Sequence, residues 1–333
     1  MSAVPKPTRR IAAIFALIAL GLLLSDAVGR FGLLDRYCLL ILGYIGINVI
    51  LATSLNLVNG YMGEFSIGHA GFMAAGAYVS AFLTVRVFPV HLQSLLFPLA
   101  VAAGGAAAAL LGLLVAIPSF RTRGDYLAIV TLAFTMIVKS AIENISALGG
   151  PRGFLGMHPL TTLPWIYLWC AAAVFFIRNF IYSSFGRGML AIREDETAGE
   201  LMGVNVRRVK AMAFSLSSFF AGVGGALLAH LLLFINPRMF DINRSTDILI
   251  MVYLGGIGSL AGSAAGAVIY TVLLEVLRPV GVWRMVLMPL ILVLIMIYRP
   301  RGIMGLKEIA LLLPARDRSR RDVPIPESER GIR

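Results

Sequence analysis

Charged residues are scarce in this sequence. Of its 333 residues, 14% are charged and 59% are hydrophobic, whereas charged residues make up roughly 25% of an ordinary soluble domain. Apolar runs of about 18 residues or more, long enough to cross a bilayer as a helix, recur along the chain. Runs such as Leu95–Ile117 do not alternate in polarity, which excludes a porin-like barrel. The composition therefore predicts an all-α, polytopic transmembrane helical bundle.

Acidic residues and cysteine are also few. The chain has 17 Asp and Glu against 29 Lys and Arg, for a formal net charge of +12. The basic residues lie between the apolar runs and at the two ends, the distribution that keeps short loops cytoplasmic, so we expect membrane lipid and no nucleic acid as a partner. Cys38 and Cys170 both fall inside apolar runs. We expect them to be inert buried thiols rather than a disulfide or a metal site.

Sequence signatures of common enzymes are missing. No Gly-x-x-x-x-Gly-Lys-Ser/Thr phosphate loop occurs, so the chain does not bind ATP in that way. Neither a His-Glu-x-x-His pattern nor a serine elbow is present. We therefore predict no catalytic residue, no metal site and no cofactor in this chain.

The apolar runs and the basic loops together predict a topology. From a cytoplasmic N-terminal segment 1–10, alternation places Arg121–Arg123 and the basic stretch Arg187–Lys210 on the cytoplasmic side, as the charge bias requires. The first run is interpreted as an uncleaved helix because no small-residue cleavage site closes it. The predicted spans are 11–28, 37–58, 66–87, 94–117, 126–143, 163–181, 210–232, 261–278 and 282–298.

One further crossing is needed by this count. Without it, the basic Arg299-Pro300-Arg301 would lie outside, against the same charge rule. The apolar stretch near 248–257 can supply a short or broken helix, because irregular backbone is tolerated where it is buried in protein or lines a cavity. The prediction is about ten crossings with both termini cytoplasmic. The membrane domain is then 11–298, with a cytoplasmic loop 182–209 and a basic tail 299–333 that we expect to be disordered from about 314.

A glycine-rich segment between 56 and 72 places ionisable groups close to membrane depth, where such groups usually face a cavity or the bundle interior. The alternative is that Glu64 lies in an ordinary loop and that His69 hydrogen-bonds to backbone as a packing element. Glycines near 255, together with Gly222, Gly224, Gly225, Gly262 and Gly266, predict close helix packing. The candidate pathway or helix-break residues are Asn56, Gly60, Gly63, Glu64, Gly68, His69, Gly255, Gly256 and Gly258.

The longest cytoplasmic loop contains an amphipathic pattern. Acidic residues around Thr197 suit a helix start, and Gly203 suits its end. Between them, Ala198, Leu201 and Met202 form an apolar face outside the bilayer, which favours a docking element for a soluble partner over a solvated loop helix. The candidate docking residues are Glu194, Asp195, Glu196, Thr197, Ala198, Leu201, Met202 and Gly203.

Several of these segments resemble the membrane permease subunits of branched-chain amino acid ABC importers. The resemblance runs from about residue 40 to 307, through Asn56–Phe72, Arg121–Ala133, Ala191–Val204 and Arg299–Gly305 in matching order. It implies a heterodimer with a second related permease, two cytoplasmic ATPase subunits that bind ATP and Mg, and a periplasmic or lipid-anchored binding protein. It also implies that Glu194–Val204 is the helix that couples to the ATPase. The general importer signature is Glu-Ala-Ala followed by a glycine at a fixed spacing. Here Glu196-Thr197-Ala198 matches it loosely, because Gly203 lies one residue farther along the chain than that spacing requires.

The resemblance leaves the cargo open between branched-chain or related aliphatic amino acids and urea or short-chain amides. A second class of function is an ion-coupled secondary transporter, in which Glu64, His69, Lys139 and Glu143 would act as relays within the membrane. The docking helix distinguishes the two classes, since an ion-driven carrier needs no ATPase. A structural scaffold explains the glycine breaks less well.

Overall fold

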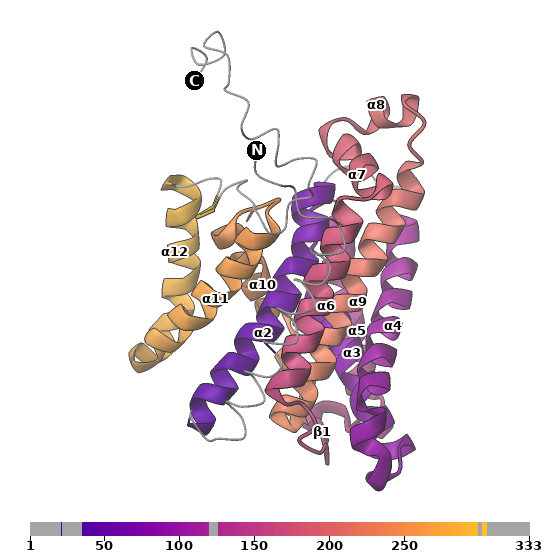
Figure 1. The fold of residues 1–333 in the computed structure, drawn as a ribbon. Helices are drawn as coiled ribbons and strands as arrows, with labels where there is room; N and C mark the ends of the chain where they lie inside the picture. Colours follow the sequence, from indigo (N-terminus) through magenta and orange to yellow (C-terminus); the bar gives the residue numbers. More distant parts are fainter. Residues whose placement is uncertain (1–20, 22–34, 120–125, 299–301, 305–333) are drawn as a thin grey trace, which may run out of the picture.

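The computed structural model describes residues 21, 35–119, 126–298 and 302–304. In this part of the chain nearly all regular structure is helical (Figure 1). The α-helices are α2 (Arg36–Asn56), α3 (His69–Phe82), α4 (Gln93–Ser119), α5 (Tyr126–Asn144), α6 (Leu163–Ile181), α7 (Ser184–Glu194), α8 (Glu196–Leu201), α9 (Val206–Leu232), α10 (Ile242–Gly255), α11 (Leu260–Val276) and α12 (Arg284–Tyr298). The π-helical turns η1 (Leu57–Met62) and η2 (Leu83–Val87) extend α2 and α3, and 3-10 turns occupy η3 (Val90–Leu92), η4 (Ser146–Leu148), η5 (Gly150–Arg152), η6 (Pro237–Phe240) and η7 (Arg278–Trp283).

Helix lengths confirm an all-α bundle built for a membrane. Among the described residues, six helices are long and apolar enough to cross a bilayer: α2, α3, α4, α5, α6 and α9, counted with their helical extensions. The last three helices are shorter, with 14 residues in α10, 17 in α11 and 15 in α12. The expected first span, 11–28, and the basic segment Arg121–Arg123 lie outside the described residues.

The predicted spans match the observed helices to within a few residues. The agreement includes the expected short helix, which appears as α10 and ends at Gly255. Gly256 (φ 132°) and Gly258 (φ 78°) then adopt backbone conformations that favour glycine. Ser259 caps the following helix by accepting a hydrogen bond from the Gly262 amide at 3.0 Å. The stretch 248–257 is therefore regular helix as far as Gly255, and the irregular backbone follows in the α10–α11 turn at 256–259.

The best-packed region consists of α3, α4 and α9. A Cβ placed on Gly76 of α3 would collide with backbone of Gly222 on α9, and one on Gly104 of α4 would lie 2.6 Å from the Gly76 carbonyl oxygen. Gly225 meets the backbone of Met73 in the same way. The glycines therefore allow direct contact between helix backbones, as the small-residue pattern predicts. Phe72 lies beside this contact and stacks on Phe134 of α5 at a centroid distance of 4.8 Å.

The loop after α5 holds η4, η5 and the strand β1 (Phe154–Leu155), which pairs antiparallel with β2 (Phe234–Ile235). The glycines at 149, 150 and 153 all have positive φ, which interrupts any helix there. The expectation that both cysteines are buried differs from the structure: both are free, but Cys38 is exposed at the start of α2 and Cys170 is half-buried.

Candidate functional site

The segment after α6 projects beyond one end of the bundle as two short helices (Figure 1). The resemblance implied a single helix over Glu194–Val204, but the backbone breaks at Asp195 (φ −157°, ψ 117°), so Glu194 ends α7 and Glu196 begins α8. The break arises because the Asp195 carboxylate caps α8, accepting from the amides of Thr197 at 2.8 Å and Ala198 at 3.0 Å.

The exposed surface of α8 is apolar at its end. Leu201 and Met202 are each 84% exposed, and Ala198 is also exposed. Gly203 (φ 83°) then turns the chain toward α9. Large apolar side chains with this exposure outside a bundle are typical of a contact surface for another chain.

Lys210, near the start of α9, connects α8 to the bundle. Its Nζ lies 2.6 Å from Glu64 Oε1 and 3.0 Å from Glu196 Oε2. The Lys210 side chain is 6% exposed, so the ammonium is nearly removed from solvent and its position is fixed by the two carboxylates. Glu64, singled out from the sequence as a possible pathway residue, therefore lies in a charged junction with the candidate docking segment.

Arg193 makes a second connection between the docking segment and the bundle. Its Nη1 donates to the Gly60 carbonyl oxygen at 3.1 Å. Gly60 lies in η1, and π-helical turns are often found at functional sites. Gly63 follows with φ 76°, and its missing Cβ leaves room for the Arg193 side chain. The end of α7 therefore rests on the break between α2 and α3.

Asn56 carries these contacts further, to the α10–α11 turn. Its buried side chain donates to the Ser259 carbonyl oxygen at 2.8 Å and accepts from the Gly258 amide at 2.9 Å. The side-chain amide of Asn56 thereby supplies partners for backbone groups of this turn that helical hydrogen bonds would otherwise satisfy. The fold brings Asn56, Gly60 and Gly258 together, and a Cβ on Gly60 would collide with the Asn56 side chain and the Gly258 amide nitrogen.

His69 and Gly68 lie at the start of α3. His69 is buried, with Nε2 3.2 Å from Ser54 Oγ, and it meets the ring of Phe72 edge to face. Gly68 packs against Thr131 of α5. The histidine bonds to a hydroxyl instead of the backbone carbonyl that the packing alternative proposed, and its position is that of a packing residue.

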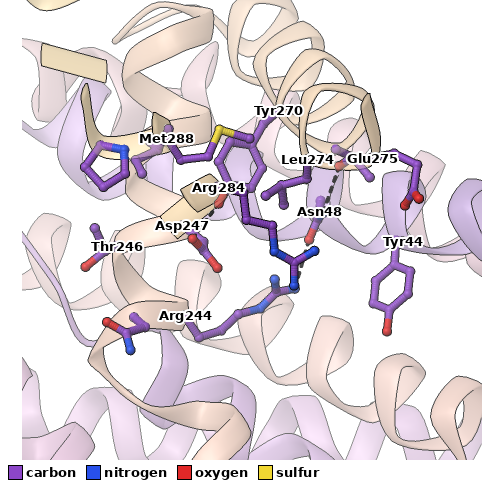
Figure 2. Close-up of a pocket in the computed structure, with 14 residues that line it drawn as sticks. Tyr44, Asn48, Arg244, Thr246, Asp247, Tyr270, Leu274, Glu275, Arg284 and Met288 are labelled. Carbon is purple, nitrogen blue, oxygen red and sulfur yellow. Dashed lines mark hydrogen bonds between the residues drawn. The ribbon is translucent and has the colours of Figure 1, made fainter. Parts of the chain in front are cut away.

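A polar cavity of about 510 Å³ lies between α2, α10, α11 and α12 (Figure 2). None of the candidate helix-break residues lines it. Asn48 of α2 accepts from Arg244 Nη2 at 2.9 Å and donates to Thr271 Oγ1 at 2.9 Å. Sequence reasoning missed this site, although Arg244 and Asp247, three residues apart beside an apolar stretch, were a usable signal.

The fold and these contacts define a multi-pass α-helical membrane protein with an extramembrane contact segment. The family described as the permease component of the branched-chain amino acid transport system matches residues 37–297. The chain belongs to this family. It is therefore a transport subunit and not an enzyme.

Individual relatives agree with this assignment. The high-affinity branched-chain amino acid transport system permease protein LivM of Escherichia coli is 33% identical over 302 residues, covering 80% of this chain and 70% of the relative. The Salmonella typhimurium LivM protein is 33% identical over 303 residues with the same coverage. The Escherichia coli LivH permease is 32% identical over 150 residues, covering 44% of this chain and 47% of LivH. No solved structure matches the chain.

Proposed function

We propose that this chain is the membrane permease subunit of an ATP-driven importer of branched-chain or related aliphatic amino acids. Family membership and the names of its relatives support the cargo. The observation that carries the ATP-driven mechanism is the α7–α8 segment, whose exposed Leu201 and Met202 offer an apolar contact at the end of the bundle. We infer a second related permease, two cytoplasmic ATPase subunits and a substrate-binding protein as partners.

The topology proposed for this function has about ten crossings, with α7–α8 and both termini in the cytoplasm of a bacterial inner membrane. The agreement of the predicted spans with α2–α6 and α9–α12 supports it. In this topology we infer that α10, with its 14 residues, supplies the extra crossing that the charge rule requires.

The proposed mechanism is alternating access driven from α7–α8. When nucleotide closes the ATPase pair, α8 moves with it. The ion pairs of Lys210 with Glu64 and Glu196, together with the Arg193–Gly60 hydrogen bond, pass this displacement to the break after α2. Asn56 then passes it to the α10–α11 turn. ATP and Mg act on the partner, and this chain contributes the mechanical link.

The ion-coupled alternative finds less support in the arrangement of its candidate relay groups. Glu64 is paired with Lys210, and Lys139 is paired with Asp241 at 2.8 Å. His69 meets Ser54 instead of a second carboxylate. Glu64, Lys139 and His69 therefore each contact a different partner instead of one another.

Reconstitution with the companion permease, the ATPases and the binding protein tests the proposal. Proteoliposomes should accumulate leucine, isoleucine and valine only when the ATPases have ATP, and uptake should survive ionophores. Excess urea should not compete. Uptake that ionophores abolish would establish ion coupling, and uptake of urea in place of leucine would establish the alternative cargo.

A further inference from the structure

Two guanidinium groups share the polar cavity. The side chains of Arg244 from α10 and Arg284 from α12 point into the same space (Figure 2). Arg244 donates to the neutral amide of Asn48, which does not cancel its charge. Among the described residues, no carboxylate lies within ion-pair distance of either arginine. Asp247 of the same cavity interacts electrostatically with both arginines, and the two guanidinium groups together present donors that match a bound carboxylate.

A carboxylate occupies another wall of the same cavity. Asp247 lies one turn after Arg244 on α10, and it accepts a hydrogen bond from the Tyr270 hydroxyl. The other acid at the cavity, Glu275, is already engaged by Arg278 at 3.2 Å and by the Tyr37 hydroxyl. Asp247 is thus the acidic group in the described lining that keeps acceptor capacity for a cation.

The remaining wall is apolar. Ile250, Leu274 and Met288 line it, and Met288 is 4% exposed. The volume of about 510 Å³ lies within the usual range of ligand pockets, about 300–1,000 Å³. A ligand that satisfies all three walls carries an anion, a cation and an aliphatic group in one small molecule.

We propose that this cavity is a transit site for an aliphatic α-amino acid. The ligand carboxylate lies between Arg244 and Arg284, its ammonium group meets Asp247, and its side chain packs on the apolar wall. The proposal rests on the proposed function and adds a location within the permease. The cavity is also connected to the coupling contacts, because the turn joining α10 to α11 is held by Asn56.

Photolabelling of the complete importer tests this site. A diazirine analogue of leucine is supplied to proteoliposomes during turnover, irradiated, and located by mass spectrometry. We expect label on α10–α12 around Ile250, Leu274 and Met288, displaced by excess leucine. In Arg284→Gln, labelling should fall and the KM for leucine should rise by about tenfold or more, because the carboxylate loses a charged donor. Arg284→Lys should recover part of this loss.

Matched variants separate ligand contact from general damage. Arg238→Gln removes an exposed arginine of η6 that does not line the cavity and should leave labelling and KM unchanged. Asp247→Asn gives a second readout, the competition between leucine and its 2-oxo analogue, which lacks the ammonium group. In the wild-type importer, leucine should displace the diazirine label better than the 2-oxo analogue does. In Asp247→Asn the difference between the two competitors should be smaller.

The outcomes distinguish this site from the function as a whole. Wild-type vesicles that transport leucine but carry the label elsewhere would overturn the cavity and leave the function standing. Displacement of the label by phosphatidylserine and not by leucine would show a lipid headgroup site, which also overturns the proposal. Absence of amino-acid uptake by the wild-type importer would overturn both.

Discussion

The two halves of the bundle are held together differently. In α3, α4 and α9, glycines such as Gly76 and Gly225 bring helix backbones into direct contact. In α2, α10, α11 and α12, glycines make such contacts near the α10–α11 turn, but a cavity lined by Arg244, Asp247 and Arg284 opens along the same helices. Close backbone packing has little room to adjust, whereas side chains around a cavity can exchange partners. We therefore expect α3, α4 and α9 to form a rigid half and α2, α10, α11 and α12 to form a half that rearranges.

The largest effect should follow from filling a glycine contact in the rigid half. Gly225→Val places a branched side chain against the Met73 carbonyl, forcing α9 away from α3. We expect a destabilisation of about 3 kcal/mol or more and little folded protein extracted in mild detergent. Met212→Val, at a partly exposed position on the same helix, should fold normally. If Gly225→Val had normal thermal stability, the claim that α3, α4 and α9 form a rigid half would be refuted.

A smaller effect is expected at the ion pairs that join the halves beside α8. Glu64 is 21% exposed and Glu196 is 47% exposed in their pairs with Lys210. Since solvent screens the more exposed pair, Glu64→Gln should reduce amino-acid uptake per ATP hydrolysed more than Glu196→Gln does. Both variants should fold. Uptake and hydrolysis assayed in the same proteoliposomes provide the comparison, and a larger loss in Glu196→Gln would reverse our ranking.

The smallest effect concerns the pair joining α5 to the start of α10. The hydrogen bond from Lys139 holds the pKa of Asp241 below its ordinary value, with a contribution from the Ile242 amide. Because the pKa is lowered in the folded state, this stabilisation is present above the unfolded-state pKa of about 3.9 and is lost as the pH falls through the folded-state pKa. The Asp241 side chain is 30% exposed, so screening limits its contribution to about 1 kcal/mol or less.

Lys139→Met tests this assignment. Melting temperatures measured from about pH 5 to pH 2.5 should fall less steeply in the variant than in the wild-type protein, since Asp241 no longer gains a partner on ionisation. If the melting temperature falls equally steeply with pH in the two proteins, this ion pair does not contribute to the pH dependence of stability.

Most helix positions could be predicted because apolar length and charge asymmetry are local properties of the sequence. Even the short α10 followed from the need to return Arg299 and Arg301 to the cytoplasmic side. The break at Asp195 was missed because a capping side chain overrode the acidic and apolar pattern on both sides of it. The polar cavity was missed because Asn48, Arg244 and Arg284 come from helices far apart in the sequence. Their proximity is a result of tertiary packing.

The central claim is that α8 transmits the work of a partner ATPase to this chain. The most direct measurement compares ATP hydrolysis and leucine uptake in the same proteoliposomes for the wild-type importer and the double variant Leu201→Glu, Met202→Glu. Leu155→Glu, at an exposed position on β1, is the control. We predict that the double variant inserts normally and that the ATPases retain basal hydrolysis, while ATP-driven uptake falls to background. Full uptake by the double variant would contradict the account.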